Sequence, residues 1–208
     1  ATSLTNAALT MDIRLVELVS HLGQQLSEGE IIQLSNTNAS DFSETVYFDV
    51  IKKKTAALFS TAAEAGAKSV HSTDEIAKKA ALIGELIGIA FQIKDDIFDY
   101  YDSADVGKPT GSDMREGKIT LPALYVLRTS SNPALEPIRE KLSKGIYLDE
   151  KEIETLIEIS KNEGGIDYTN KQIEHYRKLA IESIPEDIED EYRDALIAYI
   201  DYVISREK

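Results

Sequence analysis

Apolar residues recur at helical spacing along almost the whole 208-residue chain. The clearest case is the segment from Met11 to Leu34, where apolar side chains return every three or four residues and would form one stripe along a helix. No run alternates apolar and polar residues for long enough to indicate a strand. The sequence therefore predicts an all-α fold.

Helix start and stop signals divide this pattern into elements. We expect helices over about 1–9, 11–34, 43–69, 72–101, 121–129, 133–144, 149–163, 168–183 and 187–206, with a loop over 103–117. Thr10 is the expected cap of the second helix. Ser72 with Glu75 has the spacing of a capping box. Asp149 with Glu152 has the same spacing. No repeat and no linker divides the chain, so we expect a single domain over residues 1–208.

Composition excludes several classes of function. The formal net charge of −14 opposes binding to nucleic acid or to an anionic membrane surface, because each phosphate contact needs a cation. Cysteine is absent, which excludes disulfides and thiolate zinc sites and fits a reducing, cytoplasmic location. Charged residues interrupt every apolar stretch well before twenty residues, so we expect no transmembrane segment. A few lysines gathered with metal ions can still bind a phosphorylated ligand.

The beginning of the chain carries no helix start signal. Ala1 to Leu9 already has the pattern of a helix interior, and the first residue is not Met. We therefore expect a processed or truncated product.

The acidic segment from Phe91 to Asp105 is the strongest candidate for chemistry. On a helix, Asp95 and Asp99 share a face, Gln92 lies one turn earlier, and Asp96 lies beside them. Two carboxylates one turn apart suit Mg²⁺, which keeps waters and shares its shell with a phosphate. Like charges also repel near a helix C-terminus, so the cluster is unfavourable unless cations bind. A solvated acidic helix end is the alternative interpretation.

A glycine-rich loop with two lysines follows directly, in the sequence GKPTGSDMREGK. Its glycines let the backbone approach a ligand closely, and Lys108 and Lys118 can reach phosphate oxygens. It is not a Walker loop, because Ile119 stands where Ser or Thr is needed. On its own, the loop is equally well explained as ordinary surface.

A second lysine site lies in the helix expected over 43–69. Lys54 and Thr55 enter an apolar run and can present a cation and a hydroxyl to a cavity. A lysine whose stem lies along the helix surface is the alternative.

Together these residues resemble the trans-isoprenyl diphosphate synthases, especially the bacterial polyprenyl (octaprenyl-like) diphosphate synthases. The resemblance covers most of the chain and is sharpest over Phe91 to Leu127, Tyr47 to Phe59 and Leu22 to Leu34. The series DDxxD, GKPxGxD and EGKxTLP, in this order, is its most specific part. The resemblance implies an isoprenoid-synthase-type helical bundle and a homodimer.

The resemblance also implies roles for individual residues. Magnesium would be held by the aspartates of the second aspartate-rich motif: Asp95, Asp96 and Asp99. The substrate diphosphate would contact three lysines: Lys54, Lys108 and Lys118. Catalysis at the allylic carbon would involve Lys54, Thr55 and Gln92. Asp113 would order the loop rather than bind metal.

The implied reaction is the Mg²⁺-dependent condensation of an allylic prenyl diphosphate with isopentenyl diphosphate, head to tail, to a long-chain polyprenyl diphosphate. The magnesium ions and lysines would stabilise the departing diphosphate, and apolar helix walls would keep water from the allylic cation.

One departure from the family is large. Its members carry a first DDxxD motif with arginines and a Gly-Lys-Arg segment, and neither is present in these 208 residues. We therefore expect an N-terminally truncated bundle, the C-terminal part of the full domain, that is inactive alone. A non-catalytic partner subunit of a heteromeric synthase is the alternative. The intact aspartates and lysines favour the enzyme. A class I terpene cyclase is disfavoured by the GKPTGSD loop.

Overall fold

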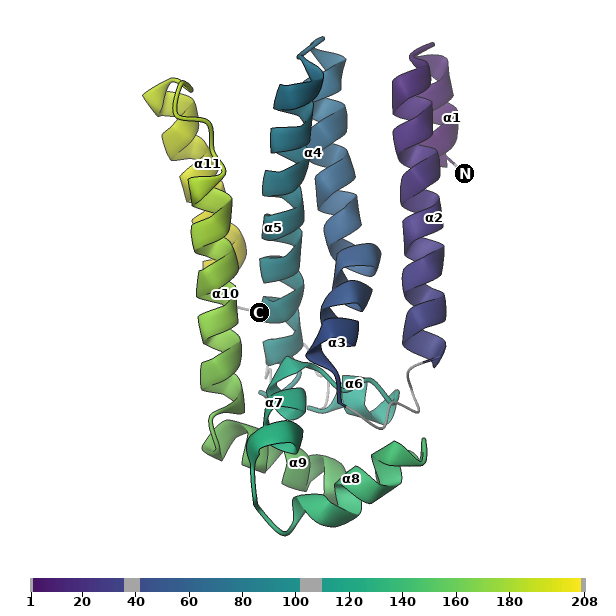
Figure 1. The fold of residues 1–208 in the computed structure, drawn as a ribbon, viewed down its shortest axis with the longest axis vertical. Helices are drawn as coiled ribbons and strands as arrows, with labels where there is room; N and C mark the ends of the chain where they lie inside the picture. Colours follow the sequence, from purple (N-terminus) through teal and green to yellow (C-terminus); the bar gives the residue numbers. More distant parts are fainter. Residues whose placement is uncertain (1, 36–41, 102–109, 207–208) are drawn as a thin grey trace. The chain divides into compact units, whose positions relative to one another are not determined.

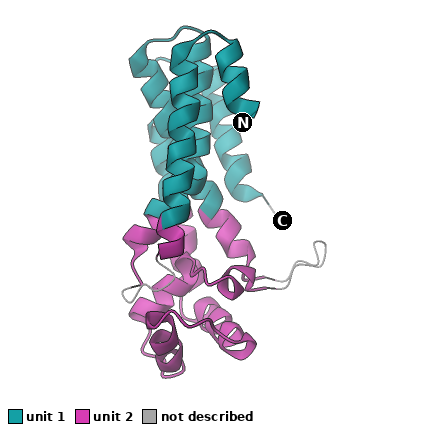
Figure 2. Ribbon diagram, turned by 90° about the vertical axis from the view of Figure 1, so that its right-hand side faces the viewer, with its two compact units in different colours: residues 1–31, 49–92, 175–206 teal, residues 32–48, 93–174, 207–208 magenta. Residues whose placement is uncertain are grey.

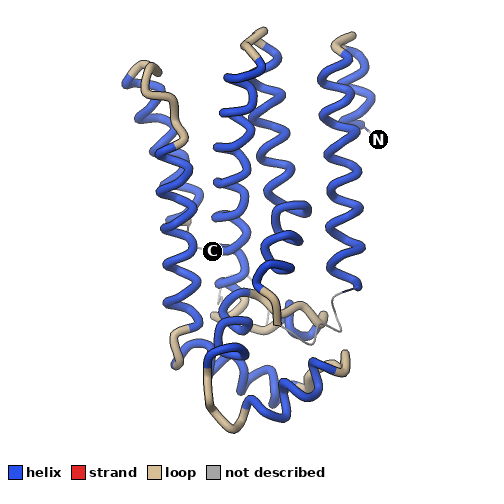
Figure 3. Tube along the Cα trace, viewed as in Figure 1, coloured by secondary structure: helices blue, strands red, loops and turns tan. Residues whose placement is uncertain are grey.

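The computed structural model describes residues 2–35, 42–101 and 110–206, and the regular structure within these ranges is entirely helical (Figure 3). This confirms the all-α prediction. The elements, labelled in Figure 1, are α1 (Thr2–Leu9), α2 (Ile13–Ser35), α3 (Glu44–Ile51), a π-helical segment (Lys52–Ala56), α4 (Ala57–Ser69), α5 (Asp74–Phe98), α6 (Ser112–Arg115), α7 (Leu121–Thr129), α8 (Leu135–Ser143), α9 (Glu150–Asn162), α10 (Gly165–Glu182) and α11 (Asp190–Ser205).

The start of α9 confirms the capping box predicted from the sequence. The Asp149 carboxylate accepts the backbone N–H of Glu152 at 3.0 Å, and the Glu152 carboxylate accepts that of Asp149 at 2.9 Å. Two N–H groups that the helix leaves unpaired are thereby satisfied.

The predicted cap of α2 is wrong. The Thr10 hydroxyl donates to the carbonyl of Ala7 at 2.6 Å and so belongs to the end of α1. Met11 has a φ of 58°, which separates the two helices, and the Asp12 carboxylate accepts the N–H of Arg14 at 3.0 Å. The cap of α2 is therefore Asp12, and the helix begins at Ile13.

The capping box predicted at Ser72 is also wrong. The hydroxyl of Thr73 accepts the N–H of Ile76 at 3.4 Å, and α5 begins one residue later than Thr73. The Ser72 hydroxyl donates instead to the Thr73 carbonyl at 3.4 Å. His71, with a φ of 58°, makes the turn into this segment, which shifts the cap by one position.

The chain divides into two compact units (Figure 2). Unit 1 comprises Ala1–Ile31, Asp49–Gln92 and His175–Arg206, and unit 2 comprises mainly Ile32–Phe48 and Ile93–Glu174. The single domain over residues 1–208 remains a prediction. No helix in the described ranges is long and apolar enough to cross a bilayer.

The core of unit 1 forms where α5 packs with the last two helices. Its buried side chains are Ile83, Leu86, Ile87, Ala180, Ile184, Ile200 and Val203. Phe59 of α4 and Phe91 of α5 lie against it with ring centroids 5.1 Å apart. Burial of this apolar surface fixes α5 within the unit.

Within unit 1, helix α2 packs tightly on the π-helical segment. A Cβ atom built on Gly29 would lie 2.8 Å from Cγ of Lys54 and 2.9 Å from Cβ of Lys53, so only glycine allows this approach. Two ion pairs join the same elements, Lys53 with Glu28 at 3.1 Å and Lys54 with Glu30 at 2.5 Å.

The core of unit 2 is larger and holds the segment after α5 in place. It contains Tyr100, Met114, Ala123, Val126, Leu127, Leu135, Ile138, Leu142, Leu148, Ile153, Leu156, Ile157, Ile159 and Ile166. Helix α9 contacts both α6 and α7 in this core. The Tyr100 hydroxyl accepts the N–H of Ala123 at 3.1 Å and lies 3.0 Å from the Thr120 hydroxyl, which pins the residues that follow α5 to the start of α7.

Replacement of Gly29 by alanine tests the close approach of α2. We expect Gly29→Ala to lower the free energy of unfolding by about 1–3 kcal/mol, because a methyl group overlaps the two lysine stems. Gly23→Ala in the same helix is the matched control. It has nothing within 4 Å and should stabilise by about 0.5–1 kcal/mol. Urea denaturation measures both variants, and a Gly29→Ala chain as stable as Gly23→Ala would contradict this packing.

Candidate functional site

The predicted acidic residues stand at the C-terminal end of α5. Ile93 and Ile97 are buried on one side of this helix end, with exposed fractions of 0% and 6%. Asp95 and Asp96 occupy the last turn, and Asp99 is the first residue after the helix, which ends at Phe98 and not near Tyr101 as predicted. The three aspartates have different surroundings: Asp95 is exposed, Asp99 is half-buried, and Asp96 is buried.

Asp96 is held by a buried tyrosine. The hydroxyl of Tyr47, in α3, donates to Oδ2 of Asp96 at 2.7 Å, and only 5% of Asp96 and 8% of Tyr47 is exposed. Burial raises the pKa of the Tyr47 hydroxyl well above its usual value, and the negative charge of Asp96 raises it further. Tyr47 therefore stays protonated as a donor to the Asp96 carboxylate.

Asp99 anchors the segment that contains α6. Its carboxylate accepts the backbone N–H of Ser112 at 2.9 Å and of Asp113 at 3.0 Å, while its carbonyl accepts the N–H of Gly111 at 2.8 Å. Gly111 has a φ of 77°, and a Cβ on it would lie 2.6 Å from Cγ2 of Ile153. These hydrogen bonds explain the short helix inside the region predicted to be a loop.

Asp113 and Lys118 complete the charged groups around this anchor in unit 2. Burial raises the pKa of the Asp113 carboxyl, and the charge of Asp99 adds to that effect. Lys118 Nζ lies 3.7 Å from Asp113 Oδ1 and 2.5 Å from Glu116 Oε2, and the hydrogen bond to Glu116 raises the pKa of the ammonium group. The backbone N–H of Lys118 also donates to the Asp113 carbonyl at 2.8 Å. The loop-ordering role that the resemblance implies for the Asp113 side chain remains a prediction.

Unit 1 holds the remaining predicted residues that the structure describes. The Thr55 hydroxyl, in the π-helical segment, donates to Oε1 of Gln92 at 2.6 Å. Lys54 in the same segment pairs with Glu30 at 2.5 Å, and the two side chains are 29% and 54% exposed. An ion pair this exposed contributes little to stability. π-helical turns are frequent at functional sites. The remaining lysine, Lys108, lies outside the described residues.

The donor set at the end of α5 fits Mg²⁺. Within the described ranges, no three acidic or histidine side chains are arranged to hold a metal ion by themselves. Magnesium does not need such a cage, because it is usually bound by one or two carboxylates, waters and substrate phosphates. Asp95 supplies an exposed carboxylate, and the second lone pairs of the Asp99 oxygens supply further acceptor capacity.

Three features of the site were missed by sequence reasoning. These are the Tyr47 partner of Asp96, the Glu30 partner of Lys54 and the π-helical turn. Tyr47 and Asp96 are 49 residues apart, and no local pattern joins them. A glycine inside the helical pattern at Gly29 was the one available signal of a close approach at Lys54.

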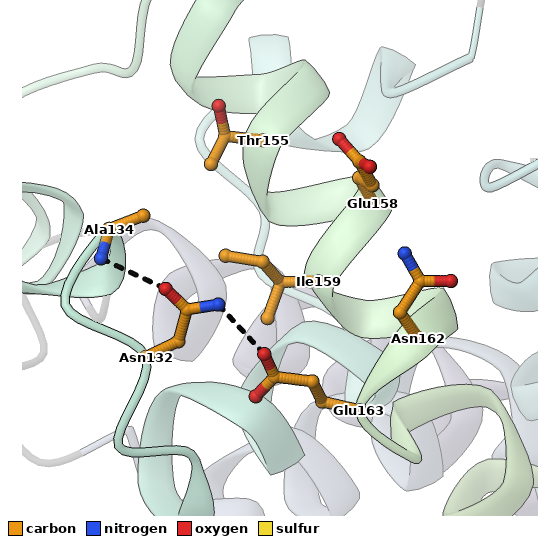
Figure 4. Close-up of a pocket in the computed structure, with 7 residues that line it drawn as sticks. All are labelled: Asn132, Ala134, Thr155, Glu158, Ile159, Asn162 and Glu163. Carbon is orange, nitrogen blue, oxygen red and sulfur yellow. Dashed lines mark hydrogen bonds between the residues drawn. The ribbon is translucent and has the colours of Figure 1, made fainter.

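A shallow pocket of about 280 Å³ lies elsewhere in unit 2 (Figure 4). It is lined by Asn132, Ala134, Thr155, Glu158, Ile159, Asn162 and Glu163. Asn132 bridges it by accepting the N–H of Ala134 at 3.0 Å and donating to Glu163 at 2.7 Å. None of the residues predicted to carry chemistry lines it.

Comparison with known proteins assigns the chain to a family. Residues 2–159 match the polyprenyl synthetase family. The chain belongs to that family. One relative, the octaprenyl diphosphate synthase of Escherichia coli K12, is 30% identical to this chain over 197 residues. The match covers 94% of this chain and 60% of the length of that protein.

Solved structures of polyprenyl synthetases have the same fold. A geranylgeranyl pyrophosphate synthase from Bacteroides thetaiotaomicron is 52% identical, with a TM-score of 0.91 over 99% of this chain and 68% of the other. A polyprenyl synthase from Caulobacter crescentus, complexed with calcium and isoprenyl diphosphate, is 29% identical, with a TM-score of 0.86 over 97% and 61%. The predicted isoprenoid-synthase-type bundle is thereby confirmed.

The anchoring role of Asp99 can be tested by hydrogen exchange. In Asp99→Ala, the amide hydrogens of Ser112 and Asp113 lose their acceptors. We expect them to exchange at least about tenfold faster, since a hydrogen bond to a charged group contributes roughly 1.5 kcal/mol or more. Asp95→Ala is the control and should leave both rates within about twofold of wild type. Unchanged protection in Asp99→Ala would contradict the anchor.

Proposed function

We propose that this chain supplies the second aspartate motif and the lysines of a polyprenyl diphosphate synthase active site. The reaction is the condensation of an allylic prenyl diphosphate with isopentenyl diphosphate. The observation that carries the proposal is the end of α5, where Asp95 is exposed while Asp99 holds the segment Gly111–Asp113 by three hydrogen bonds. The family match and the isoprenyl diphosphate complex of the Caulobacter relative support it.

In this proposal, the aspartates bind the diphosphate through Mg²⁺ and the lysines contact it directly. Asp95, with Asp99 and Asp96 behind it, would hold Mg²⁺, which when bound neutralises charge on the leaving diphosphate. Lys54, Lys108 and Lys118 would contact the diphosphate oxygens directly. The ammonium groups of Lys54 and Lys118 pair with the carboxylates of Glu30 and Glu116, which the diphosphate would replace.

Thr55 and Gln92 would act on the allylic part of the substrate. Their hydrogen bond of 2.6 Å orients the Gln92 amide and the Thr55 oxygen. The lone pairs of the Thr55 oxygen, whose proton is donated to Gln92, would stabilise positive charge at the allylic carbon. We thus propose catalytic roles for Lys54, Thr55 and Gln92.

The proposal concerns the reaction and not the length of the product. The relatives include an octaprenyl and a geranylgeranyl diphosphate synthase. The long-chain product expected from the sequence, and the homodimer, remain predictions. The 208 residues contain one DDxxD motif and span 60% of the octaprenyl synthase, so we propose that this chain alone has little or no turnover.

A thermal shift with a non-reactive allylic substrate tests the function. Farnesyl thiodiphosphate with Mg²⁺ should raise the melting temperature by about 5–10 °C at roughly 100 times its Kd, as expected for about 2.7 kcal/mol of added stability. Either component alone should give a much smaller shift. Asp95→Ala should abolish the joint effect, whereas Asp194→Ala, which removes an exposed charge from α11, should keep it.

Two results would count against the proposal. A shift in Asp95→Ala equal to that of wild type would remove the aspartate motif from the site. Measurable transfer from farnesyl diphosphate to labelled isopentenyl diphosphate by the 208-residue chain would contradict its proposed lack of turnover.

A further inference from the structure

Of the three aspartates at the end of α5, Asp96 has the least favourable surroundings for a carboxylate, because it is buried. A buried carboxylate in the last turn of a helix loses hydration and faces the negative end of the helix dipole. Neighbouring carboxylates at Asp95 and Asp99 add repulsion. A carboxylate in such a place is costly to the fold unless donors stabilise it.

The donor that makes this charge tolerable is Tyr47. Its hydroxyl donates to Oδ2 of Asp96 at 2.7 Å in a site closed to water, where hydrogen bonds to ions are strong. The carbonyl of Asp96 accepts the N–H of Asp99 at 3.3 Å, which continues the chain into the anchored turn. The Asp96 carboxylate is thus held by Tyr47, and its residue lies in sequence between the exposed Asp95 and the loop anchor Asp99.

We propose that Tyr47 is a positioning residue for cation binding: its hydrogen bond holds the buried Asp96 carboxylate in place, and the fixed end of α5 then supports a divalent ion at Asp95. The inference rests on the proposed function and deepens it. Partners behind a metal ligand tune affinity by setting orientation and local charge, and their loss typically reduces metal affinity 10- to 100-fold. Tyr47 needs no contact with the ion or the substrate.

The chain offers a matched control in a second tyrosine–carboxylate pair on the same helix. The Tyr168 hydroxyl donates to Oε2 of Glu44, the first residue of α3, also at 2.7 Å. Glu44 also pairs with Arg128 through its other oxygen, Oε1, at 2.6 Å, and this pair does not involve the Tyr168 hydroxyl. Tyr168→Phe therefore loosens α3 by a similar interaction without changing the surroundings of Asp96.

The experiment measures the Mg²⁺ concentration that gives half of the maximal melting-temperature shift, at a fixed concentration of farnesyl thiodiphosphate. In Tyr47→Phe we expect this midpoint to rise about tenfold. In Tyr168→Phe it should stay within about twofold of wild type, whatever happens to the melting temperature without ligand. Loss of stability lowers the melting temperature without ligand in both variants. The Mg²⁺ midpoint reports cation binding instead.

A double mutant tests whether Tyr47 acts through Asp96. Asp96→Asn removes the charge and should raise the Mg²⁺ midpoint by itself. Adding Tyr47→Phe to it should then change the midpoint by less than about twofold, because the carboxylate that Tyr47 holds in place is gone. A further tenfold rise in the double mutant would contradict the assigned route.

The outcomes distinguish this inference from the function on which it rests. If wild type shows no Mg²⁺-dependent shift, the proposed function fails and this inference fails with it. If wild type responds and Tyr47→Phe has the midpoint of wild type, the function stands and the role of Tyr47 is overturned. If the Mg²⁺ midpoint rises equally in Tyr47→Phe and Tyr168→Phe, Tyr47 acts only by stabilising α3. That result would also overturn the proposed role of Tyr47.

Discussion

Negative charge gathered at the C-terminal end of one helix is the constraint that shapes this part of the molecule. Carboxylates at this end oppose the helix dipole and repel one another. The structure offsets this with specific donors: the Tyr47 hydroxyl for Asp96, and the N–H groups of Ser112 and Asp113 for Asp99. Asp95 is the exposed member of the three. The cluster is thus arranged so that one carboxylate faces solvent while two organise the protein around it.

The same arrangement links the acidic motif to the segment after it. The N–H groups of Gly111, Ser112 and Asp113 donate to Asp99, directly after α5. These hydrogen bonds attach this part of the glycine-rich segment to the end of α5. Lys118 then pairs with Asp113 and Glu116. The proposed cation site at Asp95 and the proposed anion contact of Lys118 are therefore linked, because Asp99 anchors the segment that leads to Lys118.

How far the sequence predicts the structure depends on how local each interaction is. The capping box of α9 was predicted correctly, because Asp149 and Glu152 lie within one turn. The cap at Thr10 failed for a local reason: its hydroxyl has a competing acceptor in the preceding helix, the Ala7 carbonyl. Helix periodicity gave the helical class and most of the elements, since amphipathic stripes need only neighbouring residues.

The candidate site was predictable in its residue types but not in its partners. The motif order identified Asp95, Asp96 and Asp99 together, yet nothing local separates an exposed aspartate from a buried one when all three are spaced for the same helix. That difference arises from Tyr47, which is 49 residues away in sequence. The π-helical turn at Lys52–Ala56, on which Gly29 of α2 packs, has no pattern of its own in the sequence.

Paramagnetic relaxation by Mn²⁺ tests the central claim most directly, because it reports where a divalent ion binds. In NMR spectra of the chain with inorganic diphosphate, substoichiometric Mn²⁺ should broaden first the amide signals of Asp95 to Asp99, Ser112 and Asp113. Signals around the polar pocket at Asn132 and Glu163 should stay sharp. Broadening spread evenly over the acidic helices α9 and α11, with the end of α5 no more affected than they are, would contradict the account.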